Sequence, residues 1–153
     1  MSKMGVIYHK ILLFSVSILI LSFLSNSVAA QNCSATQNLP NFGCVSPNLY
    51  RGVQPTEECF KELAKLGVKT IVNLRSNNKR SRTEEEWAKN AGLTCVNFPT
   101  PKWSDPKDAE IQKLLALMDA SYTQPIFIHC KHGADRTVLL TAFYRISHDK
   151  LTS

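Results

Sequence analysis

The chain contains 153 residues, of which 44% are hydrophobic and 20% charged, and its formal net charge is +6 at pH 7. This length suits one domain with one modest core. The positive charge is compatible with an anionic substrate, but the short basic cluster at residues 77–82 is followed closely by three glutamates, which argues against a nucleic-acid-binding arm.

Residues 1–30 have the three-part pattern of a secretory signal peptide. Lys3 and Lys10 flank the start of an apolar run of about fourteen residues, and Val28 and Ala30 are the small residues that precede a cleavage site. The run is shorter than the ~20 residues that a membrane-spanning helix needs, which argues against an uncleaved anchor. We therefore expect cleavage after Ala30 and a secreted or periplasmic protein without a stable membrane span.

The five cysteines all follow this segment, at positions Cys33, Cys44, Cys59, Cys95 and Cys130. An oxidising compartment permits disulfides, but an odd number leaves at least one thiol over. If Cys130 is that thiol, three pairings of the other four are possible, and Cys33 with Cys44 is the local choice. Alternatively, Cys59 and Cys95 are small buried hydrophobic residues.

Extended and helical segments alternate from the start of the mature chain. Residues 31–48 are polar and rich in turn formers, which predicts an irregular N-terminal segment. Residues 49–55 suit a short strand. A helix is predicted from Thr56, its N-cap, to Gly67, which ends it. The β-branched run at 68–76 then predicts a buried strand.

A second helix is predicted at 83–92, where Thr83 and Glu86 form a capping box and Gly92 ends the helix. The remaining predicted elements are a strand at 93–98, a proline-punctuated loop at 99–106, a helix at 105–120 that begins with Asp105 and Pro106, a strand at 124–129 and a helix at 138–146.

This alternation of strands and helices predicts an α/β fold with a central, mainly parallel sheet flanked by helices. The apolar middle of the strand at 124–129 suits the centre of such a sheet. Ligands of parallel sheets bind at the carboxyl ends of the strands. The stretch HCKHGADRT, from His129 to Thr137, lies at such an end, between a predicted strand and a predicted helix.

The spacing of Cys130 and Arg136 within this stretch favours anion binding. Amides of the loop and of the following helix N-terminus converge on a bound anion. Gly133 supplies the backbone freedom of a tight turn, and Arg136 offers a planar fork for two phosphate oxygens. The same positive field is expected to lower the pKa of Cys130. A thiolate beneath a bound phosphate is placed for in-line attack that yields phosphocysteine.

Residues 129–137 resemble the signature of the cysteine-dependent protein tyrosine phosphatase superfamily. The segment LYRGVQPTEECFKELAKLGVKTIVNLRS, residues 49–76, resembles the opening of bacterial and atypical dual-specificity phosphatases. The resemblance covers 49–146 and implies a phosphatase domain at 49–153 with the fold of that superfamily. It also implies hydrolysis of phosphotyrosine, phosphoserine and phosphothreonine, without a metal or organic cofactor.

The resemblance implies a role for each residue of the loop. Cys130 would be the nucleophile, Arg136 would bind the phosphate and the transition state, and Thr137 would offer its hydroxyl to the cysteine sulfur. The loop amides would line the pocket, and His129 would support the loop. The residues expected at the substrate are His129, Lys131, His132, Gly133 and Ala134.

The general acid has two candidates. The family usually takes an aspartate from a separate upstream loop, where Asp105 stands, although Asp105 also suits a helix cap. Asp135 lies within the loop itself, and phosphoinositide phosphatases with the same DRT sequence have a candidate acid there. Both aspartates remain open on geometric grounds.

Particular residues leave other interpretations to be weighed. Lys131 and His132 add positive charge, which suits phosphoinositides or inositol phosphates as substrates. Val138 stands where the family usually has glycine, and the chain ends soon afterwards, which suggests an incomplete C-terminus or a protein that binds phosphorylated partners without turnover. A metal site built from His129, Cys130 and His132 is disfavoured because neighbouring strand residues face opposite sides of a sheet.

Overall fold

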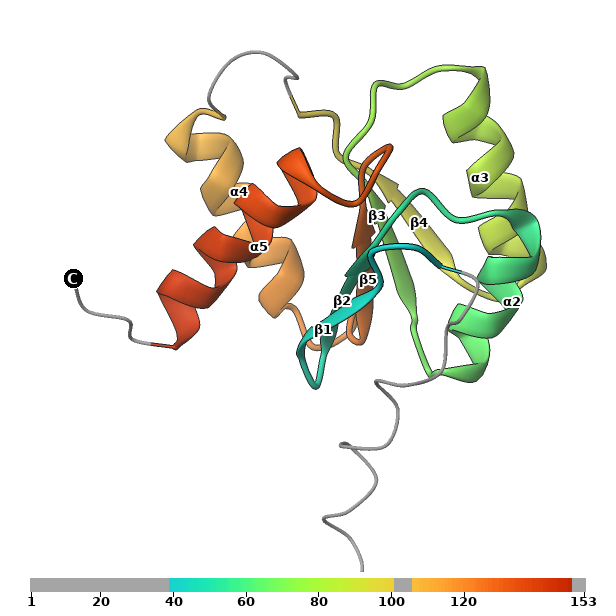
Figure 1. Ribbon diagram of the computed structural model, residues 1–153, viewed down its shortest axis with the longest axis horizontal. Coiled ribbons are helices and arrows are strands. Elements are labelled where there is room, and N and C mark those ends of the chain that lie inside the picture. Colours follow the sequence, from blue (N-terminus) through green and yellow to red (C-terminus); the bar gives the residue numbers. More distant parts are fainter. Residues whose placement is uncertain (1–38, 101–105, 150–153) are drawn as a thin grey trace, which may run out of the picture. The chain divides into compact units, whose positions relative to one another are not determined.

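The computed structural model describes residues 39–100 and 106–149 (Figure 1). The predicted signal peptide, Cys33 and Asp105 lie outside the described residues, so the expected cleavage and the pairing of Cys33 with Cys44 stay predictions. Within the described ranges, no helix is long and apolar enough to cross a membrane.

The described residues form one sheet with the strand order β1-β2-β5-β3-β4. Strands β2, β5, β3 and β4 run parallel, and only β1, at the edge, is antiparallel to its neighbour. The predicted mainly parallel sheet is therefore confirmed. The strands are β1 (Gly43–Ser46), β2 (Leu49–Gly52), β3 (Thr70–Asn73), β4 (Thr94–Asn97) and β5 (Ile126–His129).

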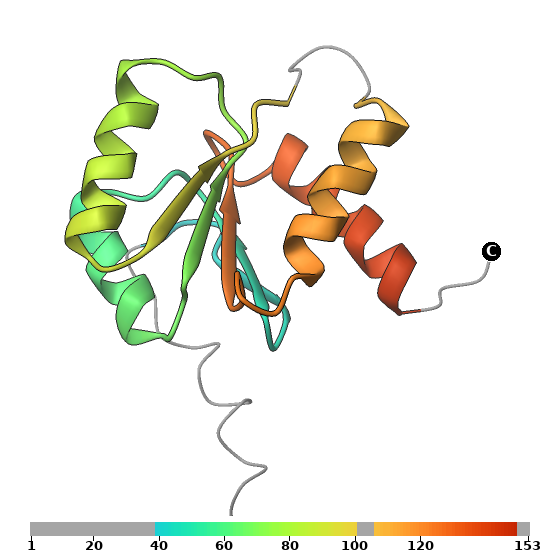
Figure 2. The same ribbon diagram turned by 180° about the vertical axis from the view of Figure 1, so that it is seen from behind.

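Helices cover both faces of this sheet, as the two opposite views show (Figures 1 and 2). One face carries α2 and α3, and the other carries α4 and α5. The helices are α2 (Glu57–Lys65), α3 (Lys79–Asn90), α4 (Asp108–Asp119) and α5 (Asp135–His148). The expected arrangement of a parallel sheet between helical layers is thus present.

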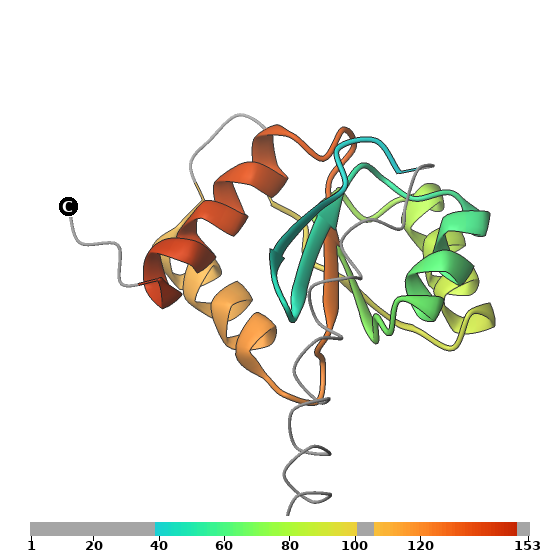
Figure 3. The same ribbon diagram turned by 60° about the horizontal axis from the view of Figure 1, so that its bottom comes forward.

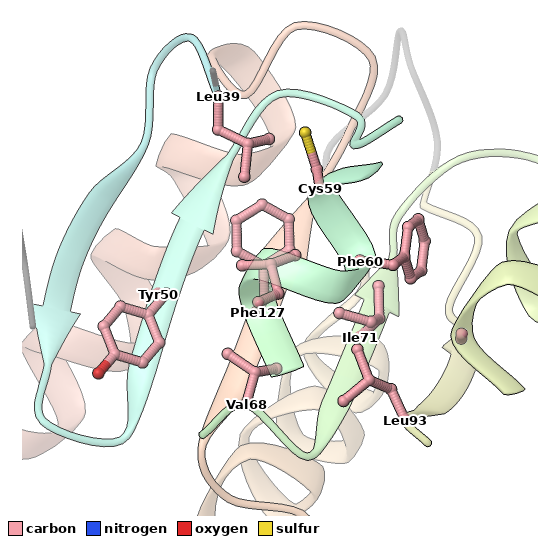
Figure 4. Packing of buried hydrophobic residues seen from close by; sticks show 10 residues of the cluster. Leu39, Tyr50, Cys59, Phe60, Val68, Ile71, Leu93 and Phe127 are labelled. Carbon is pink, nitrogen blue, oxygen red and sulfur yellow. The ribbon is translucent and has the colours of Figure 1, made fainter. Parts of the chain in front are cut away.

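Strand β5 lies in the middle of the sheet and divides the core into two clusters. Phe127 packs with Phe60 and Leu63 of α2 (Figure 4), whereas Ile126 and Ile128 pack with α4 and α5. Because side chains alternate along a strand, the next two residues also separate. His129 stacks near Phe127, with ring centroids 6.0 Å apart, and Cys130 belongs to the opposite cluster.

One strand was not predicted from the sequence, and one helix begins earlier than predicted. Residues 43–46, expected to be irregular, form β1 because their backbone pairs with β2. Helix α3 begins at Lys79 and not at Thr83. Asn78 caps it by accepting hydrogen bonds from the amides of Arg80 and Ser81, and the Thr83 hydroxyl bonds the carbonyl of Lys79 inside the helix.

Helices α4 and α5 also begin at other residues than predicted. Helix α4 starts at Asp108 with Lys107 at its N-cap position, so Pro106 precedes the helix, and the predicted cap, Asp105, lies outside the described residues. Helix α5 starts at Asp135, three residues earlier than predicted. The turn after β5 is therefore short, and Arg136 and Thr137 lie in the first helical turn, where their amides have no partners within the helix.

The carboxyl ends of the four parallel strands meet at one edge of the sheet. Gly52, His129, Asn73 and Asn97 are in register across β2, β5, β3 and β4. The segment after β5 and the first turn of α5 lie at the same edge, as the tilted view shows (Figure 3). The residues of the stretch from His129 to Thr137 therefore lie at this edge of the sheet.

Gly52 provides a test of how tightly this edge is packed. A Cβ at Gly52 would lie 2.9 Å from the Phe127 ring, which is fully buried. We expect Gly52→Ala to lower the free energy of unfolding by about 1–3 kcal/mol, measured by urea denaturation. Gly43→Ala is the matched control, because its Cβ would meet only the flexible Arg51 side chain. Equal losses in the two variants would contradict this account.

Candidate active site

The turn from Cys130 to Ala134 connects β5 to α5 and approaches the end of β2 very closely. Gly133 has φ of 67°, and a Cβ there would lie 2.3 Å from the carbonyl carbon of Gly52. No side chain fits that space, and L-residues rarely adopt that φ. The predicted need for glycine in this turn therefore has two independent causes, a backbone conformation and a close contact.

Each carbonyl from Cys130 to Gly133 accepts a hydrogen bond from a donor outside the turn. His129 Nδ1 donates to the Cys130 carbonyl at 3.1 Å, and the backbone N–H of Gln54 donates to the Lys131 carbonyl at 3.4 Å. Asn41 Nδ2 donates to the His132 carbonyl at 2.8 Å, and Arg51 Nη1 donates to the Gly133 carbonyl at 3.3 Å. In a planar peptide the N–H points away from its C=O. Carbonyls held outward therefore leave the amides of the turn directed inward.

The Cys130 thiol lies in this ring of amides and is 3% exposed. Burial alone raises its pKa, and this is the largest single influence. Hydrogen bonds from the Thr137 hydroxyl and from the amides of Thr137, His132 and Gly133 together outweigh burial, so the pKa of Cys130 is lowered. The buried Thr137 hydroxyl has no other hydrogen-bond partner among the described residues, which leaves it available to the sulfur.

Cys95, on β4, shows the opposite behaviour. Burial, followed by the negative charges of Glu84 and Glu85, raises the pKa of Cys95 to about 12. No ring of amides surrounds that side chain in a strand whose backbone groups pair with β3. Cys95 and Cys130 therefore differ in the direction of their pKa shifts because their backbone surroundings differ.

Arg136 lies in the first turn of α5 and is oriented by the neighbouring strands. Its Nη1 donates to the carbonyl of Leu74 at 2.8 Å and to that of Thr100 at 3.4 Å, which follow β3 and β4. These contacts hold the guanidinium at the carboxyl edge of the sheet. The remaining N–H groups of the fork are then available to a bound anion.

The remaining predicted site residues occupy different positions. Lys131 and His132 are exposed on the turn, and Ala134 immediately precedes α5. Asp135 is exposed at the first position of α5, whereas Asp105 lies outside the described residues, so the structure does not assign the general acid. Among the side chains that the structure describes, no group of three or more His, Cys, Asp or Glu is arranged to hold a metal ion.

Val138 does not disturb the first turn of α5. Its side chain is exposed, and its amide donates to the carbonyl of Ala134 at 2.7 Å, as a regular helix requires. The departure from the glycine of the family is therefore accommodated without a shift of the helix start. This observation removes one of the two features that suggested binding without turnover.

Sequence reasoning missed the polar residues that support the turn from outside. Asn41 belongs to a segment expected to be irregular, and Glu84 was placed only as a member of a helix. A signal for Glu84 was available, because it lies one helical turn before the buried Ala88 and so falls on the apolar face. A charged residue on such a face indicates a polar partner in the core.

Comparison with known proteins identifies relatives of this site. The family model described as "DSP-PTPase phosphatase fused to NAD+ Kinase" matches residues 31–153. The dual specificity protein phosphatase TpbA of Pseudomonas aeruginosa is 35% identical over 103 residues, which are 67% of this chain and 44% of the relative. The inositol diphosphatase DSP5 of Arabidopsis thaliana is 32% identical over 114 residues, 69% of this chain and 53% of the relative. The chain thus spans about half the length of these relatives.

Solved structures agree with this relationship. The crystal structure of P. aeruginosa TpbA in complex with phosphotyrosine superposes with a TM-score of 0.62 at 31% identity, over 73% of this chain and 66% of that one. The match of a family model to residues 31–153 includes β1 to α5 and the whole turn that surrounds Cys130. The chain therefore belongs to the cysteine-dependent protein tyrosine phosphatases of the dual-specificity type.

Proposed function

We propose that this protein hydrolyses the phosphomonoesters phosphotyrosine, phosphoserine and phosphothreonine through a phosphocysteine intermediate. The observation that carries the proposal is the Cys130 thiol, whose pKa is lowered by the Thr137 hydroxyl and by inward-facing amides despite burial. Arg136 is fixed at the same edge of the sheet. A nucleophile and an anion-binding ring in one turn suit attack on a bound phosphate.

The first chemical step transfers the phosphoryl group to sulfur. The Cys130 thiolate attacks phosphorus, so that an S–P bond forms while the P–O bond to the leaving group breaks. The general acid, Asp105 or Asp135, protonates the leaving oxygen. The amides of the turn and the Arg136 guanidinium stabilise the charge on the phosphoryl oxygens as this exchange proceeds.

The second step restores the enzyme. Water attacks phosphorus, the S–P bond breaks, and inorganic phosphate leaves as the water proton passes to the carboxylate that served as acid. The Thr137 hydroxyl, which already stabilises the thiolate form of Cys130, favours departure of sulfur in this step. The same hydrogen bond thus assists both the formation of the nucleophile and its release.

Inositol phosphates are the second candidate substrate class. Lys131 and His132 are both exposed on the turn, where they can meet further phosphate groups of a polyphosphorylated ring. The related DSP5 of A. thaliana is an inositol diphosphatase, whereas TpbA has been crystallised with phosphotyrosine.

We further propose export of the protein, on the signal-peptide pattern of residues 1–30.

Selective alkylation tests the state of the two thiols. Because its pKa is lowered, Cys130 is ionised at pH values at which an ordinary thiol, of pKa about 8.5, is mostly protonated. At pH 7 we expect iodoacetamide to label Cys130 at least about tenfold faster than Cys95, followed by peptide mass spectrometry. Inorganic phosphate should slow the labelling of Cys130 alone. Equal labelling of both cysteines would contradict the site.

A substrate panel tests the reaction and distinguishes the two substrate classes. Under reducing conditions, we expect release of phosphate from an aryl phosphate and from phosphotyrosine peptides. Cys130→Ser should lose turnover by at least about 10³-fold while it retains phosphate binding, because the serine hydroxyl is not ionised at neutral pH. Cys95→Ser is the matched control and should remain active. Faster hydrolysis of inositol phosphates than of all phosphopeptides would favour the second class.

The two candidate acids are separated by the quality of the leaving group. Asp105→Ala and Asp135→Ala are compared on an alkyl phosphate, a poor leaving group, and on a nitrophenyl phosphate, a good one. Loss of the general acid is expected to cost about 10²–10⁴-fold on the poor leaving group and much less on the good one. If neither variant shows this selective loss, both assignments are wrong.

A further inference from the structure

Glu84 of α3 is a fully buried carboxyl group behind the active-site turn. It accepts hydrogen bonds from Asn73 Nδ2 at 2.8 Å and from the Gln54 side chain, and Arg80 Nε lies 3.8 Å from Oε1. Burial of a carboxylate is costly even when it is paired. Hydrophobic residues would fill the same position in a helix at lower cost, so the carboxyl needs a reason.

The partners of Glu84 come from three neighbouring parallel strands. Gln54 follows the end of β2, Asn73 ends β3 and His129 ends β5. His129 Nε2 lies 3.2 Å from Glu84 Oε2, and both side chains are fully buried. One carboxyl group therefore joins the ends of the strands on which the catalytic turn is mounted.

Each ring nitrogen of His129 lies close to one oxygen atom. Nδ1 lies 3.1 Å from the Cys130 carbonyl, which can only accept, so Nδ1 carries a hydrogen. Nε2 is buried without an aligned hydrogen-bond partner among the described residues, although Glu84 Oε2 is within ion-pair distance. The Glu84 carboxyl therefore lies beside the Nε2 edge of the ring, while the Cys130 carbonyl lies beside the Nδ1 edge.

We propose that Glu84 is a positioning residue that acts through His129 on the peptide after Cys130, which rests on the proposed nucleophilic role of Cys130. Glu84 fixes the His129 ring, already stacked on Phe127, so that Nδ1 holds the Cys130 carbonyl outward. The amide of Lys131, on the other side of the same peptide, is then directed into the anion site.

A direct electrostatic effect of Glu84 would have the opposite sign. Its negative charge raises the pKa of Cys95, whereas it is not among the influences that set the pKa of Cys130. If Glu84 acted on Cys130 as a charge, its neutralisation would make the thiol more reactive. The positioning role predicts a less reactive thiol and weaker phosphate binding after the same change.

The test compares Glu84→Gln with Glu86→Gln, a matched control that removes an exposed charge from the same helix. The rate of Cys130 alkylation is measured against pH in the full chain, with protection by inorganic phosphate. We expect Glu84→Gln to slow alkylation at pH 7 by about fivefold or more and to weaken phosphate protection similarly. Glu86→Gln should stay within about twofold of the unchanged chain.

A double-mutant cycle with His129→Asn establishes the path of the effect. Asparagine keeps a donor near the place of Nδ1 but cannot reach Glu84. In the His129→Asn background, Glu84→Gln should change alkylation by less than about twofold, since residues that act as a unit are not additive. ¹⁵N NMR of His129 should show hydrogen on Nδ1 in the unchanged chain, and its Nε2 signal should shift in Glu84→Gln.

Three results would overturn the proposal: faster alkylation in Glu84→Gln, an equal effect of Glu84→Gln in both backgrounds, or a lower Tm with unchanged alkylation. If Glu84→Gln does not fold, His129→Asn alone decides, because it leaves the Asn73 and Gln54 contacts intact; unchanged alkylation there would refute the role. Alkylation and NMR need no turnover, so an inactive but normally alkylated chain would refute the proposed function and not this inference.

Discussion

The outward orientation of four consecutive carbonyls, from Cys130 to Gly133, is the constraint on which the rest of the site depends. Each is held by a donor from another part of the chain, and each held carbonyl turns a peptide amide inward. The net contribution of one hydrogen bond to the stability of the folded state is only about 0.5–1.5 kcal/mol, so no single contact fixes the turn. Together with the left-handed Gly133 and its contact with Gly52, they oppose the mutual repulsion of inward-pointing amides when no anion is bound. The amides are thus held in place without a bound anion, and dipoles fixed in advance in this way need no reorganisation when charge develops beside them.

Alternation along β5 separates the chemistry from its support. Cys130 faces α5, whose first turn supplies Arg136 and the Thr137 hydroxyl, and His129 faces α3, which supplies Glu84. Only the peptide between the two residues connects these sides. On the supporting side, the His129 and Glu84 side chains are both fully buried. Because the side chains of His129 and Cys130 point to opposite faces of the sheet, they do not converge on one point.

Local sequence signals predicted the parallel sheet and its helical layers, because the alternation of strands and helices can be recognised along the chain. The Cys130–Arg136 spacing stands in the sequence itself. Local signals were less successful where distant segments decide. Residues 43–46 become a strand through pairing with β2, and Asn41 reaches His132 across 91 positions of sequence. Helix α3 begins at Lys79 because Asn78 caps it by accepting from two amides, although the pattern at Thr83 and Glu86 has the form of a capping box. The position of Glu84 on the apolar face of its helix indicates a polar partner in the core, but only the structure shows that the partners come from three separate strands.

Cys95 and Cys130 show what backbone geometry adds to electrostatics. Burial raises the pKa of both, and the negative charges of Glu84 and Glu85 raise the pKa of Cys95 further, to about 12. Cys130 lies one residue beyond the end of β5, where the backbone leaves the sheet and its amides are no longer used by a neighbouring strand. A carboxylate that raises the pKa of one thiol is thus compatible with a reactive thiol nearby, provided that it acts on the second through a hydrogen-bonded histidine. The position of a cysteine relative to the end of a strand, more than its distance from charged residues, then decides whether it is inert or nucleophilic.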